Sequence, residues 1–258
     1  MDTITENELL LKFKDLMNQG DGEEAKFKDC DYLRFLRARN HQVDKAEQMM
    51  AKHLEWRKQV NFDTADTWEI PEIMINGFPY FLDGVDKDGR SAFYFPVGRW
   101  QMRQLVVGGY KSEIERHMYH SMAKLAKIVE KSKREQFVVI VDLAGLSYWQ
   151  VAHYDVVQMM LRVLREYEQN FPERLHAAVV INAPWALNII FPSIKSVLTG
   201  NTIQKLKIFD SNSSNFLPHL LDLVPPKGLP DGFREHNPKL VSLLRNVPRQ
   251  MTTCGHET

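Results

Sequence analysis

Residues 137–181 read FVVIVDLAGLSYWQVAHYDVVQMMLRVLREYEQNFPERLHAAVVI, and this stretch decides the fold. It begins and ends with apolar runs, 137–141 and 177–181, that are rich in β-branched residues and too short to be buried helices. The segment between them carries an apolar stripe at helical spacing, formed by Val156, Met160, Val163, Leu164 and Tyr167. Continuous apolar strands separated by a helix predict a parallel sheet covered on both faces.

The elements on either side extend this α/β pattern. A DKDG turn at 86–89 precedes a strand at 92–95, and residues 207–209 supply a further strand. A helix with one apolar face lies between the first two strands, over Ile114, Met118, Met122, Leu125 and Val129. The residues before Pro71 read as helices. The sequence therefore predicts an N-terminal helical module over 1–68, an α/β domain with a mainly parallel sheet flanked by helices over 69–236, and a tail over 237–258.

Composition narrows the class of protein. The chain has 258 residues, 44% of them hydrophobic, and a formal net charge of +0. This balance gives no electrostatic reason to bind nucleic acid. Attraction to an anionic membrane would require a local basic patch, and the sequence contains no obvious run of basic residues. The polar, acidic start lacks the features of a secretory signal, and Cys30 and Cys254 do not form a disulfide framework, so we expect a cytoplasmic protein.

The motifs of common enzymes are absent from the sequence. It contains no GxSxG, HExxH, GxGxxG or GxxxxGK[ST], so neither a nucleophilic centre nor a phosphate cradle is indicated, and we expect no catalysis and no cofactor. His117 and His120 have a spacing that some metal sites use, but no third ligand accompanies them, and we expect solvated histidines and no metal. Asp142 follows a strand, where a structural carboxylate capping the next turn is the favoured interpretation.

The stretch from Trp185 to Gly200 carries a second apolar stripe. Its members are Leu187, Ile190, Phe191, Ile194, Val197 and Leu198. Pro192 interrupts the backbone hydrogen bonding within it, and Gly200 is expected to end the helix. A kinked core helix lying over the sheet explains this pattern, and so does a movable amphipathic helix.

Four segments together resemble the CRAL-TRIO family of lipid-binding proteins, in particular its phosphatidylinositol/phosphatidylcholine transfer branch. They are LRFLRAR at 33–39, DKDGR at 86–90, NFPERL at 170–175 and INAP at 181–184. Their order and spacing match the family from about residue 30 to about residue 232. The resemblance implies a helical module and an α/β lipid-binding domain, and it makes the stripe at 185–199 the gate helix, which opens at a membrane. From this sequence we expect no GOLD module of the kind that some members append.

The resemblance also implies a phosphoinositide headgroup site. By position, the family's basic and polar ligands correspond to Arg39, Glu173, Arg174, Thr202 and Lys205. Arginine and lysine suit a phosphate, while glutamate and threonine can bond inositol hydroxyls. One expected lysine is Asn40 here, so the site has one charge fewer.

The expected lipid pocket is unusually apolar. It comprises Phe93, Phe95, Phe137, Val139 and Val141, and Phe93, Phe137 and Val139 stand where choline-binding members have a tyrosine and hydroxyls. The sequence is therefore compatible with two kinds of ligand. One is a phosphoinositide, and the other is a neutral isoprenoid-like hydrophobe such as a tocopherol, retinoid, carotenoid or sterol precursor. We expect a non-enzymatic protein that transfers or presents such a lipid and contacts membranes transiently.

Overall fold

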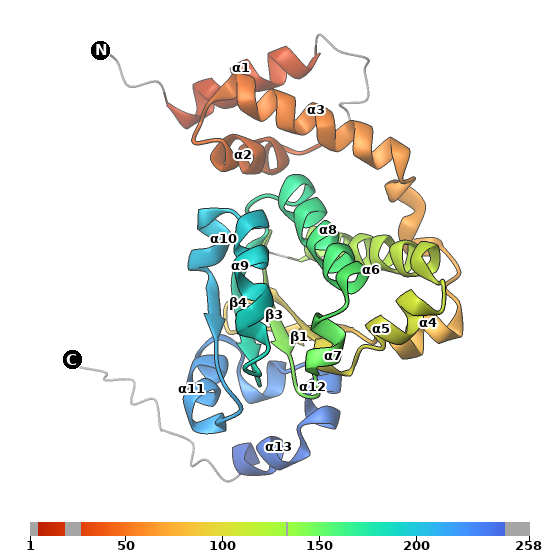
Figure 1. Cartoon of the computed structure of the whole chain (residues 1–258). Helices are drawn as coiled ribbons and strands as arrows, with labels where there is room; N and C mark the ends of the chain where they lie inside the picture. Colours follow the sequence, from red (N-terminus) through yellow and green to blue (C-terminus); the bar gives the residue numbers. More distant parts are fainter. Residues whose placement is uncertain (1–4, 19–26, 133, 246–258) are drawn as a thin grey trace, which may run out of the picture.

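The computed structural model describes residues 5–18, 27–132 and 134–245. Three helices form a separate layer at one end (Figure 1): α1 (Glu6–Asn18), α2 (Asp29–Ala38) and α3 (Val43–Gln59). Each places an apolar face toward the other two, and the buried residues of this small core include Leu10, Phe13, Tyr32, Phe35, Leu36, Ala46 and Met50. The layer therefore has a hydrophobic core of its own.

The sheet has five strands in the order β1-β2-β3-β4-β5. They are β1 (Phe81–Val85), β2 (Ser91–Phe95), β3 (Phe137–Asp142), β4 (Leu175–Ile181) and β5 (Leu206–Ile208). β1 and β2 form an antiparallel hairpin, and the other neighbours are parallel. The α/β class and the mainly parallel sheet predicted from the apolar runs are confirmed.

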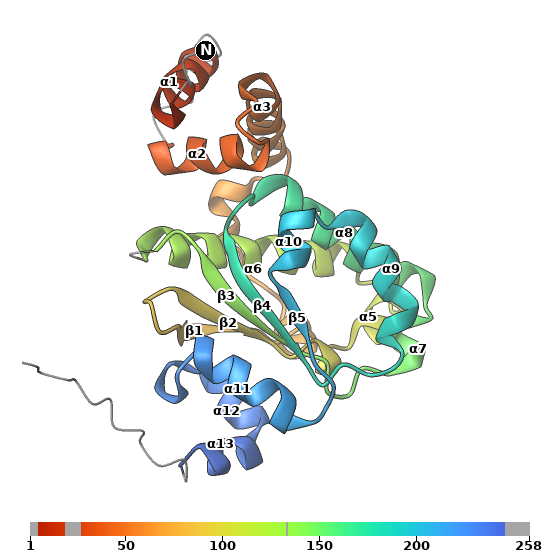
Figure 2. The ribbon, with the colours of Figure 1, turned by 90° about the vertical axis from the view of Figure 1, so that its left-hand side faces the viewer.

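Helices cover both faces of this sheet (Figure 2). One face carries α11 (Ser213–Leu223), α12 (Asp231–His236) and α13 (Pro238–Arg245). The other carries α6 (Lys111–Lys131), α8 (Tyr154–Asn170) and α9 (Leu187–Val197). Short elements connect them: η2 (Phe62–Thr67), α4 (Glu72–Gly77), η3 (Val97–Arg99), α5 (Met102–Val107), α7 (Tyr148–Val151), α10 (Gly200–Gln204) and η4 (Pro226–Gly228).

The two faces of the central strand β3 are packed differently. Val138 and Ile140 are fully buried beneath α11 and α12. On the opposite face Val139 and Val141 keep partial solvent exposure, although neighbouring strands pair with β3 on both sides. Because a close-packed interior leaves almost no accessible surface on a central strand, the helices on this second face cover the sheet less completely than those on the first.

Buried charges join the helical layer to the sheet domain. Asp31 of α2 forms ion pairs with Arg34, at 2.6 Å, and with Arg174, at 3.1 Å. Arg34 also donates to the carbonyl of Pro172 at 3.2 Å. His53 of α3 is hydrogen-bonded to Asn170 at 3.0 Å, and burial lowers the pKa of His53 to about 4. Each part therefore supplies groups that neutralise or hydrogen-bond buried groups of the other, and these contacts hold the two parts together.

Two predicted boundaries are wrong. The strand expected at 207–209 begins and ends one residue earlier, as β5. The stripe expected as one helix ending at Gly200 is broken: α9 ends at Val197, Leu198 is extended, and Gly200 begins α10. The Thr199 hydroxyl accepts a hydrogen bond from the Thr202 amide and caps α10. Residues 246–258, which include Cys254, lie outside the described residues.

Candidate functional site

A polar pocket of about 190 Å³ lies between the helical layer and the sheet domain. It collects residues from the end of α2, the C-terminal half of α8, the turn before β4, and α10. Its polar lining includes Arg39, Arg165, Glu168, Glu173, Asn201, Thr202 and Lys205. Its apolar lining includes Met49, Tyr167, Phe171, Leu175 and Val197. The structure thus brings four of the five predicted headgroup residues to one depression.

Glu173 is held in place in the polar pocket by two hydrogen bonds. Its backbone is left-handed, with φ of 57°, and its carboxylate accepts hydrogen bonds from Asn201 Nδ2 and Lys205 Nζ, each at 3.1 Å. Burial alone would raise the pKa of Glu173, but these hydrogen bonds outweigh burial and lower it. The carboxylate is therefore ionised at neutral pH and holds the Lys205 ammonium in place.

Arg39 reaches the polar pocket from the end of α2. Its amide donates to the carbonyl of Leu36 at 3.1 Å, and the next residue, Asn40, has φ of 50°. Asparagine adopts this left-handed conformation more readily than lysine. The partly buried Arg39 side chain forms no hydrogen bond or ion pair with any other residue that the structure describes. Its charge is available to a bound anion.

Arg174 does not line the polar pocket. Its guanidinium is buried, pairs with Asp31 and donates to the Glu135 carbonyl at 2.9 Å. Burial is the main cause that lowers the pKa of Arg174. The residue therefore joins the helical layer to the sheet domain.

The five predicted lipid-pocket residues share the less completely covered face of the sheet. Strand pairing sets Phe93 beside Val139 and Phe95 beside Val141. Phe93 and Phe137 are buried with ring centroids 5.2 Å apart, whereas Phe95, Val139 and Val141 are partly exposed. No hydroxyl occurs among these five residues, so their side chains offer a ligand only apolar contacts.

α9 lies over this face with its apolar stripe inward. Leu187 and Ile190 are buried, and Phe191 and Ile194 pack against the same core while keeping partial exposure. Val197 is the last helical residue, and Leu198 stands just outside the helix. Pro192 is within α9 and points to solvent. The helix is bound to the domain mainly by its first turns.

Residues 75–233 match the CRAL/TRIO domain family, which is more than half of the 258-residue chain. The chain belongs to the CRAL-TRIO family. The phosphatidylinositol/phosphatidylcholine transfer protein SFH7 of Arabidopsis thaliana is 25% identical over 253 aligned residues, covering 87% of this chain and 46% of that relative. The chain thus spans about half the length of this curated relative. A crystal structure of Sfh5 matches with a TM-score of 0.67 at 16% identity, covering 83% of this chain and 85% of that one, which shows a shared fold.

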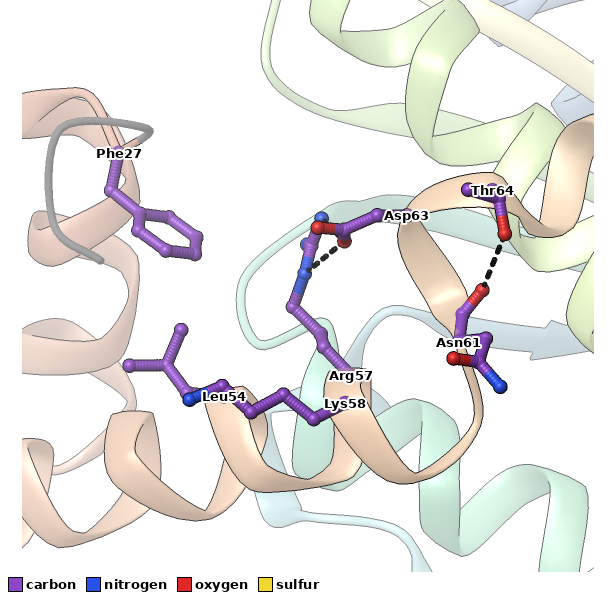
Figure 3. A pocket seen from close by; sticks show the side chains of 7 residues that line it. All are labelled: Phe27, Leu54, Arg57, Lys58, Asn61, Asp63 and Thr64. Carbon is purple, nitrogen blue, oxygen red and sulfur yellow. Dashed lines mark hydrogen bonds and ion pairs between the residues drawn. The ribbon is translucent and has the colours of Figure 1, made fainter.

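Two other depressions in this CRAL-TRIO chain differ from the polar pocket. One, of about 170 Å³, lies at the end of α3, where Arg57 pairs with Asp63 (Figure 3). The Arg57 guanidinium carbon lies 5.7 Å from the ring centroid of Phe27 and 5.3 Å from that of Phe62. The other, of about 240 Å³, separates α6 from α8. Ion pairs cross the latter from Arg162 to Glu115 and from Lys111 to Asp155. Neither contains a predicted site residue.

The expectation of solvated histidines on α6 is wrong. His117 and His120 are 2% and 7% exposed, and their rings donate to the carbonyls of Phe78, at 3.1 Å, and Ala65, at 2.9 Å. Burial lowers the pKa of both rings. No group of three or more His, Cys, Asp or Glu placed to hold a metal occurs over residues 5–18, 27–132 and 134–245.

Asp142 caps the turn after β3. Its buried carboxylate accepts hydrogen bonds from the Ala144 amide at 2.9 Å, Tyr94 Oη at 2.8 Å and Asn182 Nδ2 at 2.7 Å. With three donors already bound, the carboxylate stabilises the turn and fixes Asn182, which precedes α9.

Sequence reasoning missed several polar residues that line the polar pocket, among them Arg165, Glu168 and Asn201. Arg165 and Glu168 are two of several charged residues on α8, and nothing in the sequence distinguishes them. Asn201 follows the unpredicted break between α9 and α10, so a correct prediction of that break would have pointed to it.

Throughout the described segments, each helix is either too short or too polar to cross a bilayer.

Proposed function

We propose that this chain binds one hydrophobic lipid behind α9 and transfers it between membranes, or presents it there, without catalysing a reaction. The observation that carries the proposal is the position of the polar pocket beside the partly exposed sheet face, since a phospholipid needs a charged and an apolar site together. We further propose a cytoplasmic protein with the functional division 1–68, 69–236 and 237–258.

We propose a phosphatidylinositol headgroup as the ligand of the polar pocket. Arg39 has no partner within the described structure, and Lys205 is oriented by Glu173, so two cations are available to one phosphate. Thr202 and the remaining acceptor positions of Glu173 suit inositol hydroxyls. This assignment excludes Arg174, which does not line the polar pocket and pairs with Asp31.

The alternative ligand is a neutral isoprenoid-like hydrophobe. The observation that favours it is the wholly apolar set at Phe93, Phe137 and Val139, which provides no hydrogen-bonding group for a choline lipid. Such a ligand would occupy the same sheet face and leave the polar pocket to solvent.

α9, together with the loop to α10, is proposed as the gate. Each buried methylene contributes about 0.8 kcal/mol, so a lipid leaves a closed pocket for water only across a high barrier. Displacing α9 at a membrane replaces its contacts to the core with contacts to lipid, which lowers that barrier. The extended Leu198 and Thr199 divide α9 from α10 and supply the hinge.

Locking α9 against α8 should stop lipid exchange. A disulfide engineered from the position of Ile194 to the facing side of α8, in a chain with Cys30 and Cys254 replaced by serine, holds the gate closed when oxidised. We expect the transfer of fluorescent phosphatidylinositol between vesicles to fall on the order of tenfold or more. The same protein after reduction is the matched control and should regain the original rate. Equal rates in both redox states would show that lipids enter elsewhere.

A further inference from the structure

Three aromatic side chains stand exposed at the end of the domain where α9 begins. Tyr148, Trp149 and Trp185 are 44%, 67% and 69% exposed. Tyr148 stacks on Trp185 with centroids 5.9 Å apart, and Trp149 meets Tyr148 edge-on at 5.8 Å. Figure 2 shows α5, α7 and the start of α9 at one edge of the molecule, away from α1 to α3 and α11 to α13. Large exposed aromatic rings that touch one another indicate an interaction surface.

Basic residues accompany these rings. The Arg103 guanidinium lies 5.9 Å from the Trp149 ring centroid, and its Nη1 donates to the Trp149 carbonyl at 3.3 Å. Gln150 of α7 donates to the carbonyl of Trp100 at 2.8 Å, which ties α7 to the segment that carries the exposed Arg99. These contacts make α7, η3 and α5 one continuous face.

The charged residues of the segments that form this face are all basic. Its three segments, 96–107, 143–154 and 182–198, contain Arg99, Arg103 and Lys195 but no aspartate or glutamate, in a chain with 33 acidic and 33 basic residues. Of the acidic residues at their borders, Asp142 is buried and Asp155 is paired with Lys111 at 2.9 Å. No basic run is visible in the sequence because the patch is assembled from three separate segments.

We propose that this aromatic-basic face, formed by Arg99, Arg103, Tyr148, Trp149 and Trp185, docks the protein on an anionic bilayer. Tryptophan and tyrosine combine a large ring with a polar atom and concentrate at the level of lipid headgroups. Arginines beside them attract anionic lipids. Docking here places the start of α9 against the membrane, where the gate opens; the inference in that respect rests on the proposed function.

The test compares vesicle binding by two double variants. Trp149→Ser with Trp185→Ser should weaken co-sedimentation with phosphatidylcholine–phosphatidylserine vesicles on the order of tenfold or more. Arg99→Gln with Arg103→Gln should abolish the preference for these vesicles over pure phosphatidylcholine. The control is Leu11→Ser with Ile75→Ser, two apolar side chains 61% and 53% exposed on α1 and α4, which should bind vesicles like the wild type.

Lipid loading separates this inference from the proposed function. Each protein is offered lipid from detergent micelles, and the bound lipid is counted by native mass spectrometry, so that loading needs no membrane docking. We expect the tryptophan variant to load lipid like the wild type while failing on vesicles. If the tryptophan variant bound vesicles as well as the wild type does, the proposed docking face would be overturned. The same holds if the wild type does not bind vesicles and instead requires a protein partner. A wild type that binds vesicles through this face but never loads lipid would overturn the proposed function alone.

Discussion

Replacing Arg39 and Lys205 together by alanine should abolish phosphatidylinositol transfer between vesicles. Both side chains face the polar pocket, and each charge-assisted hydrogen bond to a phosphate contributes about 1.5–3 kcal/mol. Their loss should therefore reduce transfer by roughly 100-fold or more. The double variant should still bind a neutral hydrophobe, because the apolar sheet face is unchanged.

Lys207→Ala is the matched control for this experiment. Lys207 lies on β5, two residues from Lys205, and its exposed side chain forms no ion pair in the described part of the chain. Its removal deletes one positive charge from the same strand region, as Lys205→Ala does, without touching the polar pocket, so transfer should persist. Unchanged transfer by the Arg39 and Lys205 variant would remove the headgroup site and leave the neutral hydrophobe as the favoured ligand.

Asp31→Ala should cause a large loss of stability. Asp31 is the shared partner of Arg34 and Arg174, whose side chains are only 10% and 9% exposed. Arg34 Nε is already buried and has no hydrogen-bond partner among the described residues. Removing the carboxylate leaves two buried guanidinium groups uncompensated, so we expect a loss of about 3–5 kcal/mol in the free energy of unfolding, measured with urea.

The pH dependence of unfolding gives an independent check on Asp31. Burial raises the pKa of Asp31, but Arg34 and Arg174 and the amide of Lys28 outweigh burial and lower it. The stabilisation is therefore fully present above the unfolded-state pKa and is lost as the pH falls through the lower folded-state value. The variant should lack this acid-dependent step. Asp29→Ala, which removes an exposed carboxylate from the same helix, should change stability little; equal losses from the two substitutions would contradict the role assigned to Asp31.

The sequence allowed the centre of the fold to be predicted. The runs at 137–141 and 177–181 became β3 and β4 because a strand buried on both faces needs continuous apolar, β-branched residues. The boundaries of β5 were missed because only one neighbour fixes an edge strand. The break after Val197 was also missed, although Thr199 three residues before Thr202 is a capping signal; Gly200 was interpreted as the end of one helix instead of the start of the next.

Side chains whose partners are distant in sequence could not be placed. His117 and His120 were expected in solvent because helical spacing puts His120 opposite the apolar stripe of α6. The structure supplies acceptors for them from Phe78 and Ala65, which the spacing along one helix cannot reveal. The resemblance assigns both Glu173 and Arg174 to the headgroup site, but the backbone at Glu173 is left-handed, with φ of 57°, and the two side chains leave the chain in different directions. Glu173 therefore reaches the polar pocket and Arg174 reaches Asp31.

Native mass spectrometry of the protein purified from its own cells tests the central claim most directly, because it weighs whatever the pocket holds. The account predicts one lipid molecule per chain, released on unfolding, with a diacyl phosphoinositide as the expected species. A neutral isoprenoid-like lipid in its place would preserve the lipid-binding function and reject the headgroup assignment. A chain that carries no lipid, and takes none from vesicles or detergent micelles, would contradict the account.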